Sequence, residues 1–115
     1  QSFIFTNLID TDQIYGHRQD PEGYGTCLEE IDRAIPAILN KLKDDDVLVI
    51  TGDHGNDPAD NSTDHTREFV PLLVVEKQKA AKNLGVRDTF SDVAASALAY
   101  FKIENDLPGT SLLDE

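Results

Sequence analysis

The sequence predicts an α/β fold in which short apolar strands alternate with amphipathic helices. Apolar runs typical of buried strands lie at residues 3–9, 46–51 and 71–75. Apolar residues recur every three or four positions at residues 22–43 and 90–101, as expected for amphipathic helices. Strands and helices in this order are typical of a sheet covered by helices, so we expect a three-layer sandwich.

The first strand and the first helix are separated by a polar segment. Residues 10–21 are polar and contain Gly16, which predicts a loop. The helix that follows has a regular apolar stripe, formed by Tyr24, Cys27, Leu28, Ile31, Ile35, Ile38, Leu39 and Leu42. Pro36 lies inside this helix and removes one backbone donor, so we expect a kink or a break near Ala34. On this stripe, Cys27 is expected to be a core residue.

The second strand follows a run of three aspartates and is the most apolar of the three. Val47–Ile50 is typical of a central strand in a parallel sheet. Residues 52–68 then form a long polar loop before the third strand. Thr89 or Ser91 can cap the second helix. Its expected apolar stripe is Phe90, Val93, Ala94, Ala97, Leu98 and Phe101.

Length and charge limit the classes of function. A chain of 115 residues is expected to form one domain. With 22 acidic and 10 basic residues, its net charge of −12 repels nucleic acids and anionic lipid surfaces, so neither is expected as a partner. No apolar run is long enough to span a membrane, and no signal-peptide pattern is present. The single cysteine fits a reducing cytoplasm, where we expect the protein.

The chain contains no methionine and opens inside an apolar run, Phe3-Ile4-Phe5. Natural chains begin with methionine and seldom start inside a strand. We therefore expect an internal or C-terminal piece of a longer protein. The alternative is that processing has removed the first methionine.

All three histidines lie in the two loops that directly follow predicted strands. They are His17, His54 and His65, and the carboxylates near them are Asp12, Asp53 and Asp64. Ligands of α/β proteins bind beyond the carboxyl ends of strands. Imidazole nitrogens and carboxylate oxygens without a thiolate suit Zn²⁺ or Mn²⁺. The pattern predicts a metal site, and the alternative is that the histidines are surface residues of polar loops.

Asp53-His54-Gly55 is the sharpest signal, because it comes directly after a buried strand. Two adjacent side chains on a sharply turning loop can both reach one site. Gly52 and Gly55 permit the backbone angles that such a turn requires.

Three segments resemble the phosphopentomutases, a family of the alkaline phosphatase-like metalloenzyme superfamily. The segments are Asp12–Arg18 (DQIYGHR), Thr51–Pro58 (TGDHGNDP) and Thr63–Glu68 (TDHTRE). Asp-His-Gly is shared across the superfamily, whereas the other two segments favour the phosphopentomutases. The resemblance runs along nearly the whole chain and matches only the C-terminal portion of the family's sequence.

The resemblance implies two divalent metal ions, usually manganese, with zinc or magnesium possible. By motif position, Asp12, His17 and His65 correspond to ligands of one ion, and Asp53 and His54 to ligands of the other. The family completes the second set with an aspartate near its N-terminus and with a threonine that is phosphorylated during turnover. Neither has a counterpart here, so residues 1–115 are expected to be the C-terminal part of the metal-binding core domain, without the cap domain and the N-terminal part of the core.

The activity implied by the resemblance is interconversion of (deoxy)ribose 1-phosphate and (deoxy)ribose 5-phosphate, with a sugar bisphosphate as activator. The small-molecule partner would be a pentose phosphate, and this chain alone is expected to be inactive. One alternative is a cofactor-independent phosphoglycerate mutase or another phosphohydrolase of the superfamily. Another is a non-catalytic half-domain that binds metal.

Three further expectations concern residues around the site, and a fourth concerns the edge of the sheet. Asp64 is expected to support a ligand or cap the loop and not to bind metal. Asp10 is either a hydrogen-bond acceptor behind the site or solvated, and Arg67 orients a ligand or phosphate or pairs with an acid of its loop. A truncated sheet would also expose an edge through which the chain can associate with itself.

Overall fold

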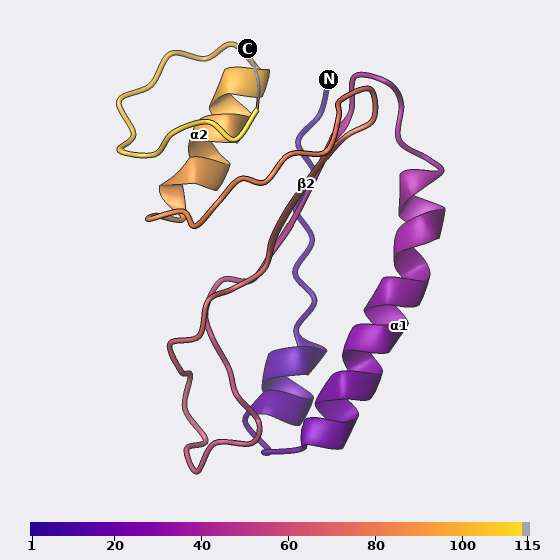
Figure 1. The fold of residues 1–115 in the computed structure, drawn as a ribbon, viewed down its shortest axis with the longest axis vertical. Helices are drawn as coiled ribbons and strands as arrows, with labels where there is room; N and C mark the ends of the chain where they lie inside the picture. The colour runs from indigo at the N-terminus through magenta and orange to yellow at the C-terminus, as the bar shows by residue number, and fades with distance from the viewer. Residues whose placement is uncertain (114–115) are drawn as a thin grey trace.

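The computed structural model describes residues 1–113, so the last two residues of the expected domain lie outside the described residues. The elements follow in the order η1 (Thr11–Gly16), α1 (Pro21–Leu39), β1 (Val47–Thr51), β2 (Leu72–Glu76) and α2 (Ser91–Tyr100) (Figure 1). The α/β class is therefore confirmed. Among the described residues no helix is both long and apolar enough for a membrane span.

The two strands pair with each other in antiparallel orientation. Val47 lies opposite Glu76 and Thr51 opposite Leu72, and the described residues form a sheet of these two strands. The prediction that Val47–Ile50 is a central strand of a parallel sheet is thus wrong, because among residues 1–113 β1 pairs only with β2 and in antiparallel orientation. A parallel pair needs a crossover connection, usually a helix, whereas the segment between β1 and β2 contains no helix and returns the chain in the opposite direction. The three-layer sandwich is not formed by the described residues.

The expected first strand is also wrong, because residues 1–9 have no regular secondary structure. Phe3, Ile4 and Phe5 are 65%, 84% and 79% exposed. A strand needs a neighbour that pairs with its backbone groups, and β1 and β2 pair only with each other. The segment is apolar, as a strand would be, but it has no pairing partner in the described part of the chain.

The predicted loop at residues 10–21 instead contains η1, a short π-helix. Its wide turns are visible in the hydrogen bonds from the His17 amide to the Asp12 carbonyl and from the Asp20 amide to the Tyr15 carbonyl, each 2.9 Å. π-Helical turns are uncommon and are frequent at functional sites. This turn brings the side chains of Asp12 and His17 to the same end of the molecule.

Helix α1 begins with a cap that the sequence signals clearly. The Asp20 carboxylate accepts a hydrogen bond from the Gly23 amide, and Pro21 occupies the first turn. The expected break near Ala34 is wrong, because the helix continues through Pro36 to Leu39. Proline removes only its own donor, and its carbonyl still accepts from the Asn40 amide at 3.0 Å, which closes the last turn.

The amphipathic face of α1 lies where the periodicity predicts it. Its half-buried apolar residues are Tyr24, Cys27, Ile31, Ile35 and Leu39, and α1 packs against η1 at its N-terminal end (Figure 1). Cys27 is half-buried and not fully enclosed, and burial is the main reason that the pKa of its thiol is raised. No residue of α1 is completely buried.

Helix α2 is held by the C-terminal tail, which folds back around it (Figure 1). Neither predicted cap residue occupies the N-cap position, which is Phe90; Thr89 lies one residue before it, and its hydroxyl accepts from the Ser91 amide at 3.1 Å. The predicted apolar stripe is wrong: the buried residues of α2 are Asp92, Ala95 and Ser96. Polar residues can face the tail because Ser96 Oγ accepts from the Leu112 amide at 2.8 Å and so satisfies both groups.

Candidate metal centre

Two loops bring the three histidines together at one end of the molecule. Gly55 and Thr66 form an isolated antiparallel bridge, in which the Thr66 amide donates to the Gly55 carbonyl at 3.1 Å. His54 and His65 flank this bridge, so their rings stack with centroids 3.5 Å apart and planes 15° apart. His17 reaches the same place from the end of η1, with its ring centroid 4.9 Å from that of His65.

The Asp12 carboxylate lies at the centre of the histidine cluster. Its Oδ1 atom is 3.1 Å from His65 Nε2, 3.3 Å from His17 Nε2 and 4.0 Å from His54 Nε2. The Nε2 atoms of His17 and His65 are 3.2 Å apart. Asp53 lies at the outer side, with its Oδ1 atom 3.6 Å from His54 Nε2 and its side chain 85% exposed. All five residues singled out in the sequence therefore lie in one cluster.

Hydrogen bonds fix the tautomers of two of the histidines. His17 Nδ1 lies 2.5 Å from the Thr63 carbonyl oxygen, and His54 Nδ1 lies 3.0 Å from the Gly55 carbonyl oxygen. A carbonyl oxygen only accepts, so Nδ1 carries the proton in both rings. In a neutral ring the lone pair is then on Nε2, which is the atom that faces Asp12.

This arrangement brings nitrogen and oxygen ligand atoms together. The Nε2 atoms of His65 and His17 lie 3.1 and 3.3 Å from Asp12 Oδ1, and His54 Nε2 lies 4.0 Å from it. Asp12, His54 and His65 each offer one ligand atom, and these atoms lie within 4.8 Å of one another. Nitrogen and oxygen donors without sulfur fit a divalent ion such as Mn²⁺, Zn²⁺ or Mg²⁺.

Comparison with known proteins identifies the class to which this cluster belongs. Residues 1–105 match the family model described as the metalloenzyme superfamily. The chain belongs to the metalloenzyme superfamily. Such membership implies that the protein binds divalent metal, in agreement with the Asp and His cluster.

Individual relatives within the superfamily are phosphopentomutases. The chain is 54% identical over 114 residues to a phosphopentomutase of Acetivibrio thermocellus, and this match covers 98% of the chain. It is 50% identical over 116 residues to that of Dictyoglomus turgidum and 50% identical over 115 residues to that of an Anaeromyxobacter species, over the whole chain in both cases. The predicted resemblance to phosphopentomutases is confirmed. The chain spans about 29% of the length of these relatives.

One polar residue next to the cluster was not singled out from the sequence. Asn56 Nδ2 donates a hydrogen bond to Asp12 Oδ1 at 2.8 Å. Its place directly after the superfamily's Asp-His-Gly was the available signal. An amide in such a loop otherwise resembles any polar turn residue.

The remaining candidates are less closely involved. Within the described residues, no hydrogen bond or ion pair joins the Asp64 carboxylate to the cluster, and Asp64 and Asp10 are exposed. The phenol of Tyr24 has a raised pKa, first because it is partly buried and then because of negative charge on Asp12 and other nearby acids. Tyr24 therefore stays protonated at neutral pH.

A cavity of about 490 Å³ opens beside the cluster. Asp53, His54, Arg67, Arg87 and Phe90 are among the residues that line it. Arg67 is exposed at this cavity, where an anion could reach its guanidinium. The prediction that Arg67 orients a ligand or phosphate stays a prediction.

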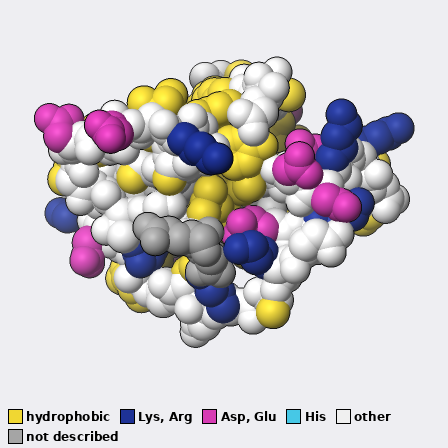
Figure 2. All heavy atoms as spheres, turned by 90° about the horizontal axis from the view of Figure 1, so that it is seen from above, with side chains coloured by type: hydrophobic (Ala, Val, Ile, Leu, Met, Phe, Trp, Pro, Cys, Tyr) yellow, Lys and Arg dark blue, Asp and Glu magenta, His cyan; other side chains and the backbone are white. Residues whose placement is uncertain are grey.

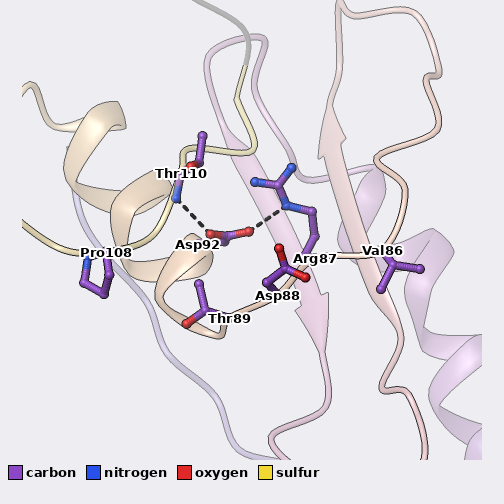
Figure 3. A pocket seen from close by; sticks show the side chains of 7 residues that line it. All are labelled: Val86, Arg87, Asp88, Thr89, Asp92, Pro108 and Thr110. Carbon is purple, nitrogen blue, oxygen red and sulfur yellow. Dashed lines mark hydrogen bonds and ion pairs between the residues drawn. The ribbon is translucent and has the colours of Figure 1, made fainter.

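A second cavity of about 190 Å³ lies farther along, between the start of α2 and the tail (Figure 3). There Asp92 Oδ2 accepts from Arg87 Nε at 2.6 Å, and Asp92 Oδ1 accepts from the Thr110 amide at 2.8 Å. The Thr110 amide, followed by Arg87, lowers the pKa of Asp92, although burial acts in the opposite direction. Both oxygens of this carboxylate accept hydrogen bonds that hold the tail and Arg87, and Asp92 is not part of the metal cluster.

Proposed function

We propose that Asp12, His17, Asp53, His54 and His65 hold two divalent ions in the phosphoryl-transfer centre of a phosphopentomutase. The observation that carries this proposal is the convergence of imidazole Nε2 atoms on one carboxylate oxygen of Asp12. Two of these imidazoles have their lone pairs turned toward that oxygen by hydrogen bonds on the opposite side of the ring. Relatives named phosphopentomutase support the choice of reaction.

The five residues divide into two sets in this proposal. Asp12, His17 and His65 hold one ion, and their mutual distances of 3.1–3.3 Å support a common ligand set. Asp53 and His54 contribute to the other, and their exposed outer position beside the larger cavity supports this division. In the family's pattern, an aspartate and a phosphorylated threonine complete the second set, and no residue of this chain matches them.

The reaction proposed for the whole protein moves a phosphoryl group between the 1- and 5-positions of ribose or deoxyribose, with a sugar bisphosphate as activator. When bound, two dications would neutralise the charge of the phosphoryl oxygens and help to activate a hydroxyl nucleophile. The carbonyl contacts of His17 and His54 hold the rings in one orientation, so the site needs little rearrangement. Arg67, exposed at the neighbouring cavity, is available to orient a phosphate.

Several finer features belong to the same proposal. Manganese is the preferred metal, and residues 1–115 correspond to the C-terminal part of a three-layer, metal-binding core domain. The location is the cytoplasm, and the substrate is a small pentose phosphate. A high local density of positive charge from the ions makes a phosphate substrate compatible with a chain of net charge −12.

An assay of the chain with and without its proposed complement tests this function. Formation of ribose 5-phosphate from ribose 1-phosphate is measured with added Mn²⁺, for the chain alone and mixed with the remaining portion of the Acetivibrio thermocellus relative. The chain alone should bind Mn²⁺ weakly and show no turnover, and the mixture should restore turnover. Full turnover by the chain alone would contradict the proposed set of catalytic groups. Mn²⁺ binding without turnover in any mixture would favour the non-catalytic half-domain.

A further inference from the structure

One hydrogen bond from a residue outside the expected ligand set joins the long loop after β1 to η1 at the metal cluster. Asn56 Nδ2 donates to Asp12 Oδ1, although the two residues are 44 positions apart in the sequence. Asp12 Oδ1 is also the atom that the three imidazoles face. Asn56 therefore acts directly on the carboxylate at the centre of the site.

Gly16 provides the space in which this amide lies. A Cβ atom at Gly16 would stand 2.2 Å from Asn56 Nδ2 and 2.7 Å from Asn56 Cγ, both closer than real Cβ contacts. Gly16 is buried, and its backbone does not need glycine, because Gly85 is the glycine with positive φ in the described part of the chain. Space for Asn56 is thus the reason for a glycine at this position.

We infer that Asn56 is a positioning residue, which turns the Asp12 carboxylate toward the imidazoles, and that Gly16 is required for its contact. This inference rests on the proposed metal site. The amide N–H occupies one lone pair of Oδ1 and holds the carboxylate in one rotamer, which leaves the second lone pair of Oδ1 for the cluster. Being neutral, the amide adds no positive charge that would compete with a cation.

The dissociation constant for Mn²⁺, measured on the 115-residue chain by electron paramagnetic resonance, tests the inference. Asn56→Leu keeps a similar side-chain size and removes the donor, so Mn²⁺ affinity should fall by about 10–100-fold, as for other groups that orient metal ligands. Gly16→Ala should produce a similar fall, because the new methyl group displaces the amide. Gly25→Ala is the matched control, since nothing lies within 4 Å of a Cβ at that position, and its affinity should be unchanged.

A double-mutant cycle separates positioning from general damage to the fold. In an Asn56→Ala background the methyl group of Gly16→Ala has room, so Gly16→Ala should cause little further loss of affinity. Thermal unfolding of the metal-free variants, followed by circular dichroism, provides the structural readout. A merely structural role would lower the unfolding temperature and leave the affinity of the folded chain unchanged.

The outcomes distinguish this inference from the proposed function. Unchanged affinity in Asn56→Leu, with Mn²⁺ bound normally by the unmodified chain, would overturn the inference alone. Additive losses in Gly16→Ala and Asn56→Ala would overturn the role given to Gly16. Failure of the unmodified chain to bind Mn²⁺ would overturn the proposed function and, with it, the positioning role of Asn56.

Discussion

At the scale of single residues, the candidate site depends on which histidine nitrogen carries the proton. Carbonyl oxygens of Thr63 and Gly55 fix this for His17 and His54, and both bonds come from the backbone of the long loop after β1. The loop therefore supplies side chains to the cluster and also sets their orientation. Binding and catalytic residues are often found on loops that a rigid scaffold positions.

Removal of a ligand should affect metal binding much more than folding. His65→Ala and Asp53→Ala each remove a side chain that is at least 45% exposed, so stability should change by no more than about 0.5 kcal/mol. Metal content measured by atomic emission, together with circular dichroism, checks both effects. In a complemented enzyme either variant should lack turnover, and a fully active Asp53→Ala enzyme would contradict the assignment.

At the scale of elements, helix α1 contains a position at which a substitution should raise stability. α1 carries Gly25 in its interior, where it is exposed and has no neighbour within 4 Å of a Cβ position. Gly25→Ala should stabilise the chain by about 0.5–1 kcal/mol, because alanine loses less backbone freedom in a helix than glycine does. Urea unfolding measures this, and destabilisation would mean that Gly25 faces a partner in solution.

The link between α2 and the tail predicts a dependence on pH. The lowered pKa of Asp92 means that its contribution to stability is present above its ordinary value of 3.8 and is lost as the pH falls below that value. Asp92→Asn should destabilise the chain by about 1–3 kcal/mol at pH 6, because the amide cannot accept from both the Arg87 guanidinium and the Thr110 amide.

Urea unfolding at pH 6 and pH 3 measures this effect. The loss of stability between the two pH values should be smaller in Asp92→Asn than in the unmodified chain. Asp88→Asn, which alters an exposed neighbouring carboxylate, controls for the removal of one charge. An identical loss of stability in Asp92→Asn and the unmodified chain would show that Asp92 is not the group responsible.

Local patterns predicted both α-helices and both paired strands from the sequence, but not η1. Spacing of three and four residues identified α1 and α2, and apolar runs identified β1 and β2. Antiparallel pairing and the exposed segment at residues 1–9 were missed, because pairing depends on partners distant in the sequence. The buried face of α2 was missed for a similar reason, since Asp92 is tolerated there only through its bonds to Arg87 and Thr110.

The candidate site was more accessible to sequence reasoning than the sheet. Its residue types are rare, they follow strands directly, and they lie in segments that resemble one family. The position of Asn56 could not be predicted, because a hydrogen bond across 44 residues leaves no local pattern.

At the scale of the whole molecule, little apolar surface is fully enclosed. Ala95 and Leu112 are the buried apolar residues of the described chain, whereas several large apolar side chains are exposed (Figure 2). The two-stranded sheet also leaves an unpaired edge on each strand. Such an edge is a template for pairing with a second chain.

We therefore expect the chain to self-associate as its concentration rises. Sedimentation velocity between about 5 and 500 μM should show a concentration-dependent shift from monomer to larger species. Leu73→Lys, at a 56% exposed position of β2, should reduce that shift, because a charge at a strand edge opposes pairing. A monomer at every concentration would contradict the expected use of this edge.

Selective broadening of nuclear magnetic resonance signals by Mn²⁺ tests the metal assignment most directly. Substoichiometric Mn²⁺ is added to the ¹⁵N-labelled chain, and the loss of each amide and imidazole signal is followed. The first signals to disappear should be those of Asp12, His17, Asp53, His54 and His65, while those of α2 and the tail persist. Broadening centred on the acidic run Asp44–Asp46, or spread evenly over the chain, would contradict it.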